Sequence, residues 1–266
     1  MSSSSSTTTA QTFDYYAVIL DESGSMHDFA KDTLGSLRQF FNDQRKISTS
    51  DSQFHVTTFS TNTEPRFKGT LASELTFKYA PCGNTALYDA IGGTVNDVLN
   101  TLSRLDRKPN DVYIIIITDG YENSSRKYNQ TAVKELIEKQ KSHDWKFVFL
   151  GANQDVFKTG GSIGVSSDSC LNYAQNSYAT PQALNAVSNG IKRQKFAKAN
   201  GFSCSSVQFT DVERTASNSC GYDPAASRGG YAPVLSSPIK THARALCTSC
   251  GGPAHSVWPC PQPLKK

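Results

Sequence analysis

The sequence lacks the features that mark export and membrane insertion. No apolar run in its 266 residues approaches the roughly 20 residues that span a bilayer. The first nine residues have no basic start and no apolar centre, so residues 1–12 predict a disordered arm rather than a secretory signal. We therefore expect a cytoplasmic protein with no membrane partner. A location in a virion stays open. In that setting its seven cysteines would be reduced thiols or metal ligands.

Signs of catalysis are also missing. The stretch Gly160–Gly164 is glycine-rich but lacks the lysine and hydroxyl pair of a phosphate-binding loop. His55 and His143 have no cysteine nucleophile at a recognisable spacing, and no paired acid and base suggests hydrolysis. The formal net charge of +4 is mild and indicates no particular partner. We expect a protein that is not an enzyme.

What is present is an alternation of apolar strands and amphipathic helices over residues 13–199. From Val112 to Ile117 the odd-numbered and the even-numbered residues are both apolar, as in a central parallel strand that is covered on both faces. The segment Thr63 to Lys68 follows the preceding strand closely and contains Pro65, which is typical of an antiparallel partner at a sheet edge. The alternation predicts an α/β fold: a doubly wound, mostly parallel six-stranded sheet with one antiparallel edge strand.

The expected elements can be placed along the chain. Strands are expected at 15–20, 53–59, 63–68, 112–117, 145–150 and near 170–174. Longer helices are expected at about 30–46, 87–105, 130–142 and 181–199.

Oxygen donors follow the first strand. Asp21, Ser23 and Ser25 alternate in the stretch directly after the apolar run, and hard cations such as Mg²⁺ take oxygen ligands. Aspartate, serine and glycine also form ordinary turns, so this stretch alone leaves both interpretations open. Asp119 ends a second strand and Thr85 lies on a loop entering a helix. Because doubly wound folds bind ligands at the carboxyl ends of their strands, we expect these side chains to converge.

Three motifs together resemble a known family. Asp21-Glu22-Ser23-Gly24-Ser25, then Gly83-Asn84-Thr85, then Thr118-Asp119-Gly120 resemble, in order and placement, the metal-ion-dependent adhesion site (MIDAS) of von Willebrand factor A (vWA) domains. The resemblance covers residues 13–199 and implies a vWA domain with a complete site.

The resemblance also implies roles for these side chains. Ser23, Ser25 and Thr85 would be ligands of Mg²⁺ (or Mn²⁺), and Asp21 and Asp119 would bind directly or through water. One position would stay open for an acidic residue of a protein partner. The alternative is a turn at Asp119 and a helix cap at Thr85. Glu22 is expected to be solvated or at the rim.

The chain changes character after residue 199. Residues 200–243 are rich in glycine, serine, proline and alanine and predict a flexible linker. Residues 244–262 then carry a second ligand set with the spacing C-x2-C-x4-H-x4-C: Cys247, Cys250, His255 and Cys260. Three thiolates and one imidazole close a tetrahedral Zn²⁺ shell, which would supply the folding energy of so short a segment. We assign no role to Cys82, Cys170, Cys204 and Cys220.

This spacing resembles the retroviral-type CCHC zinc knuckle, with departures. Thr248 stands where knuckles usually carry an aromatic or apolar residue, and Ala254 stands where they usually carry glycine. Knuckles commonly bind single-stranded RNA or DNA by stacking bases, and others bind proteins, so both partners stay open. The candidate nucleic-acid contacts are Trp258, Arg244, Lys265 and Lys266.

The two ligand sets favour a binding protein. We expect the vWA domain to grip an acidic residue of a partner through Mg²⁺, and the knuckle to bind nucleic acid or a second protein. Two alternatives remain: an accessory subunit of an AAA-type ATPase machine, and a virion-associated or nucleic-acid-packaging protein.

Overall fold

The computed structural model describes residues 13–47, 52–70, 75–202 and 205–219. Within them, six strands form one sheet in the order β3-β2-β1-β4-β5-β6. The strands are β1 (Asp14–Asp21), β2 (Gln53–Phe59), β3 (Thr63–Gly69), β4 (Asp111–Thr118), β5 (Trp145–Gly151) and β6 (Cys170–Asn172). All neighbours pair in parallel except β2 and β3. The predicted mostly parallel sheet with one antiparallel edge strand is therefore confirmed.

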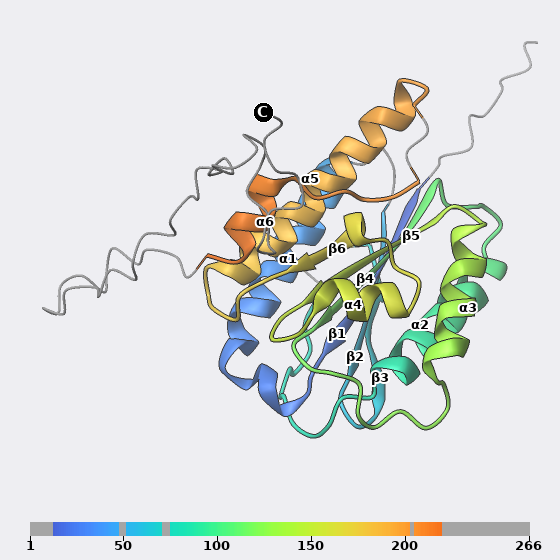
Figure 1. The fold of residues 1–266 in the computed structure, drawn as a ribbon. Coiled ribbons are helices and arrows are strands. Elements are labelled where there is room, and N and C mark those ends of the chain that lie inside the picture. The colour runs from blue at the N-terminus through green and yellow to red at the C-terminus, as the bar shows by residue number, and fades with distance from the viewer. Residues whose placement is uncertain (1–12, 48–51, 71–74, 203–204, 220–266) are drawn as a thin grey trace, which may run out of the picture. The chain divides into compact units, whose positions relative to one another are not determined.

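Helices cover both faces of this sheet (Figure 1). They are η1 (Gly24–Phe29), α1 (Ala30–Ile47), α2 (Leu87–Ser103), α3 (Gln130–Lys141), α4 (Val156–Ser162), η3 (Ser167–Ser169), α5 (Ala179–Ala199) and α6 (Asp211–Ser217). One apolar core joins the sheet to α1 and α5, and the other joins it to α2, α3 and α4. The central strands β1 and β4 are buried along their whole length, because both of their faces are covered.

Helix α6 lies within the span expected to be a flexible linker. Thr210 caps it, and the side chain of Glu213 accepts a hydrogen bond from the Thr210 backbone in return. Just before it, Val207 is fully buried in the core beneath α5. The Arg214 guanidinium donates to the carbonyl oxygen of Cys170 at 2.7 Å, at the start of β6. The ordered fold thus continues past residue 199 to residue 219.

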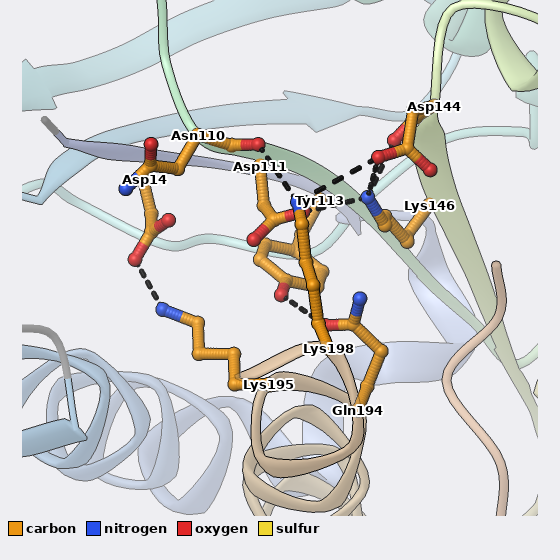
Figure 2. A network of polar contacts seen from close by, with 9 residues as sticks. All are labelled: Asp14, Asn110, Asp111, Tyr113, Asp144, Lys146, Gln194, Lys195 and Lys198. Carbon is orange, nitrogen blue, oxygen red and sulfur yellow. Dashed lines mark hydrogen bonds and ion pairs between the residues drawn. The ribbon is translucent and has the colours of Figure 1, made fainter. Parts of the chain in front are cut away.

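A polar network ties the amino ends of three strands to α5 (Figure 2). Lys195 pairs with Asp14 on β1, and Lys198 pairs with Asp111 on β4 at 2.8 Å. Lys146 on β5 is fully buried, and its ammonium lies 2.6 Å from Asp111 and 2.8 Å from Asp144. Each buried charge therefore has an opposite charge in contact, as burial requires.

Candidate metal site

The site lies where the strand order reverses. From β1 the chain continues to β2 on one side, and it later returns to β4 on the other side of β1. Asp21 ends β1, and Asp119 directly follows β4, which pairs with β1 in parallel. The carboxyl ends of the two strands therefore meet at one edge, which is the place where folds of this kind bind ligands.

Four of the five predicted side chains form one connected group. The Ser23 backbone N–H donates to Asp21 Oδ1 at 2.7 Å, and the Ser23 and Ser25 hydroxyl oxygens are 3.1 Å apart. The Ser25 hydroxyl then donates to Asp119 Oδ1 at 2.7 Å, across 94 residues of sequence. The structure thus brings Asp21, Ser23, Ser25 and Asp119 together.

Thr85 lies against the same group. A Cβ atom placed on Gly120 would be 3.1 Å from Thr85 Oγ1, so this hydroxyl faces the residue next to Asp119. The loop is held by Asn123, whose side chain accepts from the Thr85 N–H at 2.9 Å and whose own N–H donates to the Thr85 carbonyl. The alternative role as a helix cap is wrong, because the N-cap of α2 is Ala86 and no side chain caps it.

The group is buried on the protein side and open on the other. Asp21, Ser23, Thr85 and Asp119 are each at most 4 % exposed, whereas Ser25 is exposed. Burial and, to a smaller extent, the charge of Asp119 raise the pKa of Asp21 to about 6, against the opposing hydrogen bonds from Thr118 and Ser23. Neither Asp21 nor Asp119 forms an ion pair with a residue that the structure describes, and a bound cation would stabilise two such neighbouring carboxylates.

The donor set fits a hard divalent cation. Three hydroxyl and two carboxylate side chains supply oxygen only, which suits Mg²⁺ or Mn²⁺. Among the described residues, no three His, Cys, Asp or Glu side chains gather into a metal-binding group. A dication held here would therefore depend on hydroxyl oxygens, and it would be neutralised less completely than by a set of three carboxylates.

Other side chains, which are not among the predicted ligands, hold Asp21 and Asp119 in place. The Thr118 hydroxyl donates to Asp21 Oδ2 at 2.6 Å, and the Tyr79 hydroxyl donates to the Asp21 carbonyl oxygen. The Gln175 amide donates to Asp119 Oδ2 and itself accepts from the Asn153 amide at 2.5 Å. Thr118 was detectable as the neighbour of Asp119, whereas no sequence signal marks Gln175, which reaches the site from the loop after β6.

Glu22 differs from the expectation of a solvated or rim residue. It is 6 % exposed and accepts from the Arg66 guanidinium and from the Ala80 N–H, at 2.8 and 2.7 Å. Burial by itself would raise the pKa of Glu22, but hydrogen bonds from Thr58, Ala80 and Arg66 outweigh it and hold the pKa below its usual value. Glu22 therefore anchors the loop at residue 80 beside the site.

The predicted zinc ligands and nucleic-acid contacts lie outside the described residues. They are Cys247, Cys250, His255 and Cys260, with Arg244, Trp258, Lys265 and Lys266. Their roles stay predictions of the sequence.

The fold and the site define an α/β protein with a group of oxygen donors at the switch point of its sheet. The family model for the von Willebrand factor type A domain matches residues 17–189. The chain therefore belongs to the von Willebrand factor type A domain family. No curated protein matches it.

Solved structures of low sequence identity share the fold. Proximal thread matrix protein 1 from the mussel byssus has a TM-score of 0.52 at 16 % identity, over 65 % of this chain and 46 % of that one. A further structure of the same protein, described as having a zinc-occupied MIDAS motif, has a TM-score of 0.50 at 14 % identity, over 68 % and 46 %. The PilB minor pilin from Streptococcus sanguinis has a TM-score of 0.52 at 12 % identity, over 70 % and 62 %. This chain thus spans less than two thirds of each of these proteins.

None of the helices in the described ranges is both long and apolar enough to cross a membrane.

Proposed function

We propose that this chain is a non-enzymatic binding protein that recognises an acidic residue of a protein partner through a divalent cation. Asp21, Ser23, Ser25, Thr85 and Asp119 would hold the cation, Mg²⁺ being the ion that the oxygen-only donor set favours. When bound, the cation supplies positive charge for an incoming carboxylate. The proposal rests on one observation: Ser25 links the end of β1 to Asp119 after β4 through hydroxyl contacts of 2.7 to 3.1 Å.

The residues around such a site would have separate roles. The buried carboxylates provide the negative charge that attracts a cation, and Thr118 and Gln175 keep their oxygens oriented. Ser25 is exposed, so the group opens to solvent at its side. The exposed Tyr121 ring lies just beyond Gly120 and offers a partner an apolar contact beside the carboxylate position.

The cation is tested by calorimetric titration of the full chain with MgCl₂. We expect Ser25→Ala to weaken Mg²⁺ binding by at least about tenfold, because it removes one oxygen donor at an exposed position without opening the core. Ser103→Ala, which removes an exposed hydroxyl at the end of α2, is the matched control and keeps the affinity. Equal Mg²⁺ affinity in both variants and the wild type would refute the site.

The adhesion role is tested separately. The full chain is used as bait with Mg²⁺, with EDTA, and with Asp21→Asn in the presence of Mg²⁺. The role is supported by a partner that the wild type and the exposed-site control Asp106→Asn both retain in Mg²⁺. That partner should be lost in EDTA and with Asp21→Asn. Capture that is unchanged by EDTA and by Asp21→Asn contradicts it, even where the titration shows Mg²⁺ binding.

For the C-terminal segment we propose a closed Zn²⁺ site that binds nucleic acid or protein. The support is the four-ligand spacing of Cys247, Cys250, His255 and Cys260 in the sequence. Elemental analysis of the full chain should find one zinc, which Cys250→Ser removes and Asp21→Asn leaves. A titration with single-stranded RNA then decides the partner: unchanged affinity in Cys250→Ser argues against nucleic acid. The intracellular location, the ATPase-accessory role and the packaging role stay predictions.

A further inference from the structure

A hollow lies at the end of the sheet opposite the metal site. It has a volume of about 550 Å³ and is lined by the ends of α2 and α3 and the beginnings of β4 and β5. Because β4 and β5 run in parallel, their first residues lie a full strand length from Asp119. Leu99, Leu102 and Trp145 form apolar walls. The volume is in the range of sites that hold small organic molecules.

Two polar side chains of this lining have no hydrogen-bond partner among the residues that the structure describes. Gln140 is 3 % exposed and Trp145 is 7 % exposed as whole residues. Neither side chain makes a hydrogen bond within the described residues, and neither is among the unpaired polar side chains that are shut off from solvent. The Gln140 amide and the Trp145 indole N–H therefore reach solvent at the wall of the hollow, where they are available to hydrogen-bond an occupant or water.

The charges of the hollow do not balance. Its carboxylates, Asp111 and Asp144, are both paired with Lys146, and Lys198 adds a second cation to Asp111 (Figure 2). Lys108 and Lys139 also line the hollow, and neither has an ion pair or hydrogen bond from its side chain to any described residue. The lining therefore carries uncompensated positive charge. Exposed lysines are common by themselves, but here they border apolar walls and unpaired hydrogen-bonding groups.

We propose that this hollow binds a small organic anion with a flat apolar body. The anionic head is held by Lys108 and Lys139, the rings pack against Leu102 and Trp145, and the Gln140 amide hydrogen-bonds a polar atom of the ligand. An aromatic carboxylate or sulfonate has this chemistry. None of the lining residues belongs to the metal site, so the proposal does not depend on the adhesion role.

The test uses two dyes that share one ring system. 1-Anilinonaphthalene-8-sulfonate carries a negative charge, and N-phenyl-1-naphthylamine has the same rings without the sulfonate. Each is titrated into the full chain carrying Trp258→Phe, which leaves Trp145 as the only tryptophan. We expect energy transfer from Trp145 to both bound dyes, and roughly tenfold tighter binding of the sulfonate, because two nearby cations favour it.

Variants at the lysines separate this site from adventitious dye binding. Lys108→Gln with Lys139→Gln should remove the preference for the charged dye, whereas Lys192→Gln, on the exposed side of α5, should keep it. Leu99→Trp should weaken both dyes by filling the hollow. Equal affinities for the two dyes, no energy transfer from Trp145, or a preference that survives the double lysine change would overturn the proposal. Mg²⁺ and EDTA should give the same dye affinities, and a difference between them would overturn the independence of the two sites.

Discussion

Thr118 illustrates how one hydroxyl outside the ligand set supports the metal site. Its side chain is fully buried and donates to Asp21 Oδ2 at 2.6 Å. Thr118→Val keeps the shape and removes that hydrogen bond. We expect Mg²⁺ affinity to fall by about tenfold, since partners that orient metal-binding carboxylates typically contribute that much. Calorimetric titration of the variant with MgCl₂ measures the change.

The matched control for this prediction is Thr94→Val on α2. Thr94 is also buried, but its hydroxyl has no hydrogen-bond partner among the described residues. Its replacement should leave Mg²⁺ affinity unchanged and should not destabilise the fold. A loss of affinity of similar size in both variants would show that Thr118 acts through general packing.

His55 gives the fold a pH dependence at the scale of one residue. Its ring is fully buried on β2, near Tyr15 on β1, Asp97 on α2 and Lys68 on β3. Burial and, to a smaller extent, the charge of Lys68 lower the pKa of His55 to about 4, against the opposing charge of Asp97. Above pH 6.5 the ring is neutral in the folded and unfolded chains and has no effect on the pH dependence. Between pH 6.5 and 4 only the unfolded chain gains the proton, so stability falls.

The expected loss from His55 is about 3 kcal/mol of unfolding free energy when this titration is complete. Urea unfolding of the wild type and His55→Gln, each at pH 7 and pH 4.5, measures it. The stability difference between the two chains should shift in favour of the variant as the pH falls, because glutamine does not titrate. The metal-site carboxylates titrate in both chains and cancel in the comparison. A difference that does not change with pH would contradict the assignment to His55.

At the scale of elements, Val207 tests whether residues 205–219 belong to the fold. It is fully buried, and a Cβ atom placed on Gly190 of α5 would lie 2.6 Å from its Cγ1 atom. Val207→Ala should lower the unfolding free energy by roughly 2 kcal/mol, because it leaves a cavity beneath α5. Val212→Ala, at a position on α6 that is 78 % exposed, should change it by less than about 0.5 kcal/mol. If urea unfolding shows that neither substitution changes the unfolding free energy, residues 205–219 are a linker that does not pack on the fold.

Most elements could be predicted from the sequence, and α6 shows why one could not. Residues 112–117 are apolar on both parities, which fixes a central strand whatever its neighbours are. The helix at 211–217 has no apolar face of its own in a segment rich in serine and glycine. It is held by its capping box and by Arg214, which binds carbonyls more than 40 residues away. Contacts between residues so far apart in the chain leave no local pattern in the sequence.

The same distinction applies to the metal site. Asp21 and Asp119 could be placed together because parallel strands bring their carboxyl ends to one edge, a property of topology. The burial of Glu22 depends on Arg66, and the orientation of Asp119 depends on Gln175, both far along the chain. Side chains that reach a site from distant loops are set by loop conformations, which hydrophobic periodicity does not encode.

On the scale of the whole molecule, the two ends of the sheet carry separate polar centres. The metal site occupies the carboxyl ends of β1 and β4, whereas the network around Lys146 occupies the amino ends of β1, β4 and β5 (Figure 2). The first forms no ion pair with a described residue and would need an added cation for charge balance, whereas the second is balanced by its own lysines. Stability and cation binding should therefore be separable by mutation.

Asp111→Ala is the change that tests this separation. It removes the 2.6 Å contact to Lys146, a fully buried ammonium whose remaining carboxylate, Asp144, is largely exposed. We expect the unfolding free energy to fall by roughly 3 kcal/mol, because an under-compensated charge stays buried. Mg²⁺ affinity of the folded chain should not change.

In the double variant with Lys146→Met, no buried charge is left without a partner, and Lys198 can return to water since its side chain is 48 % exposed. Urea unfolding of the double variant should therefore show that most of the lost unfolding free energy is recovered. If the two single changes instead add up in the double variant, each side chain stabilises the fold by packing alone.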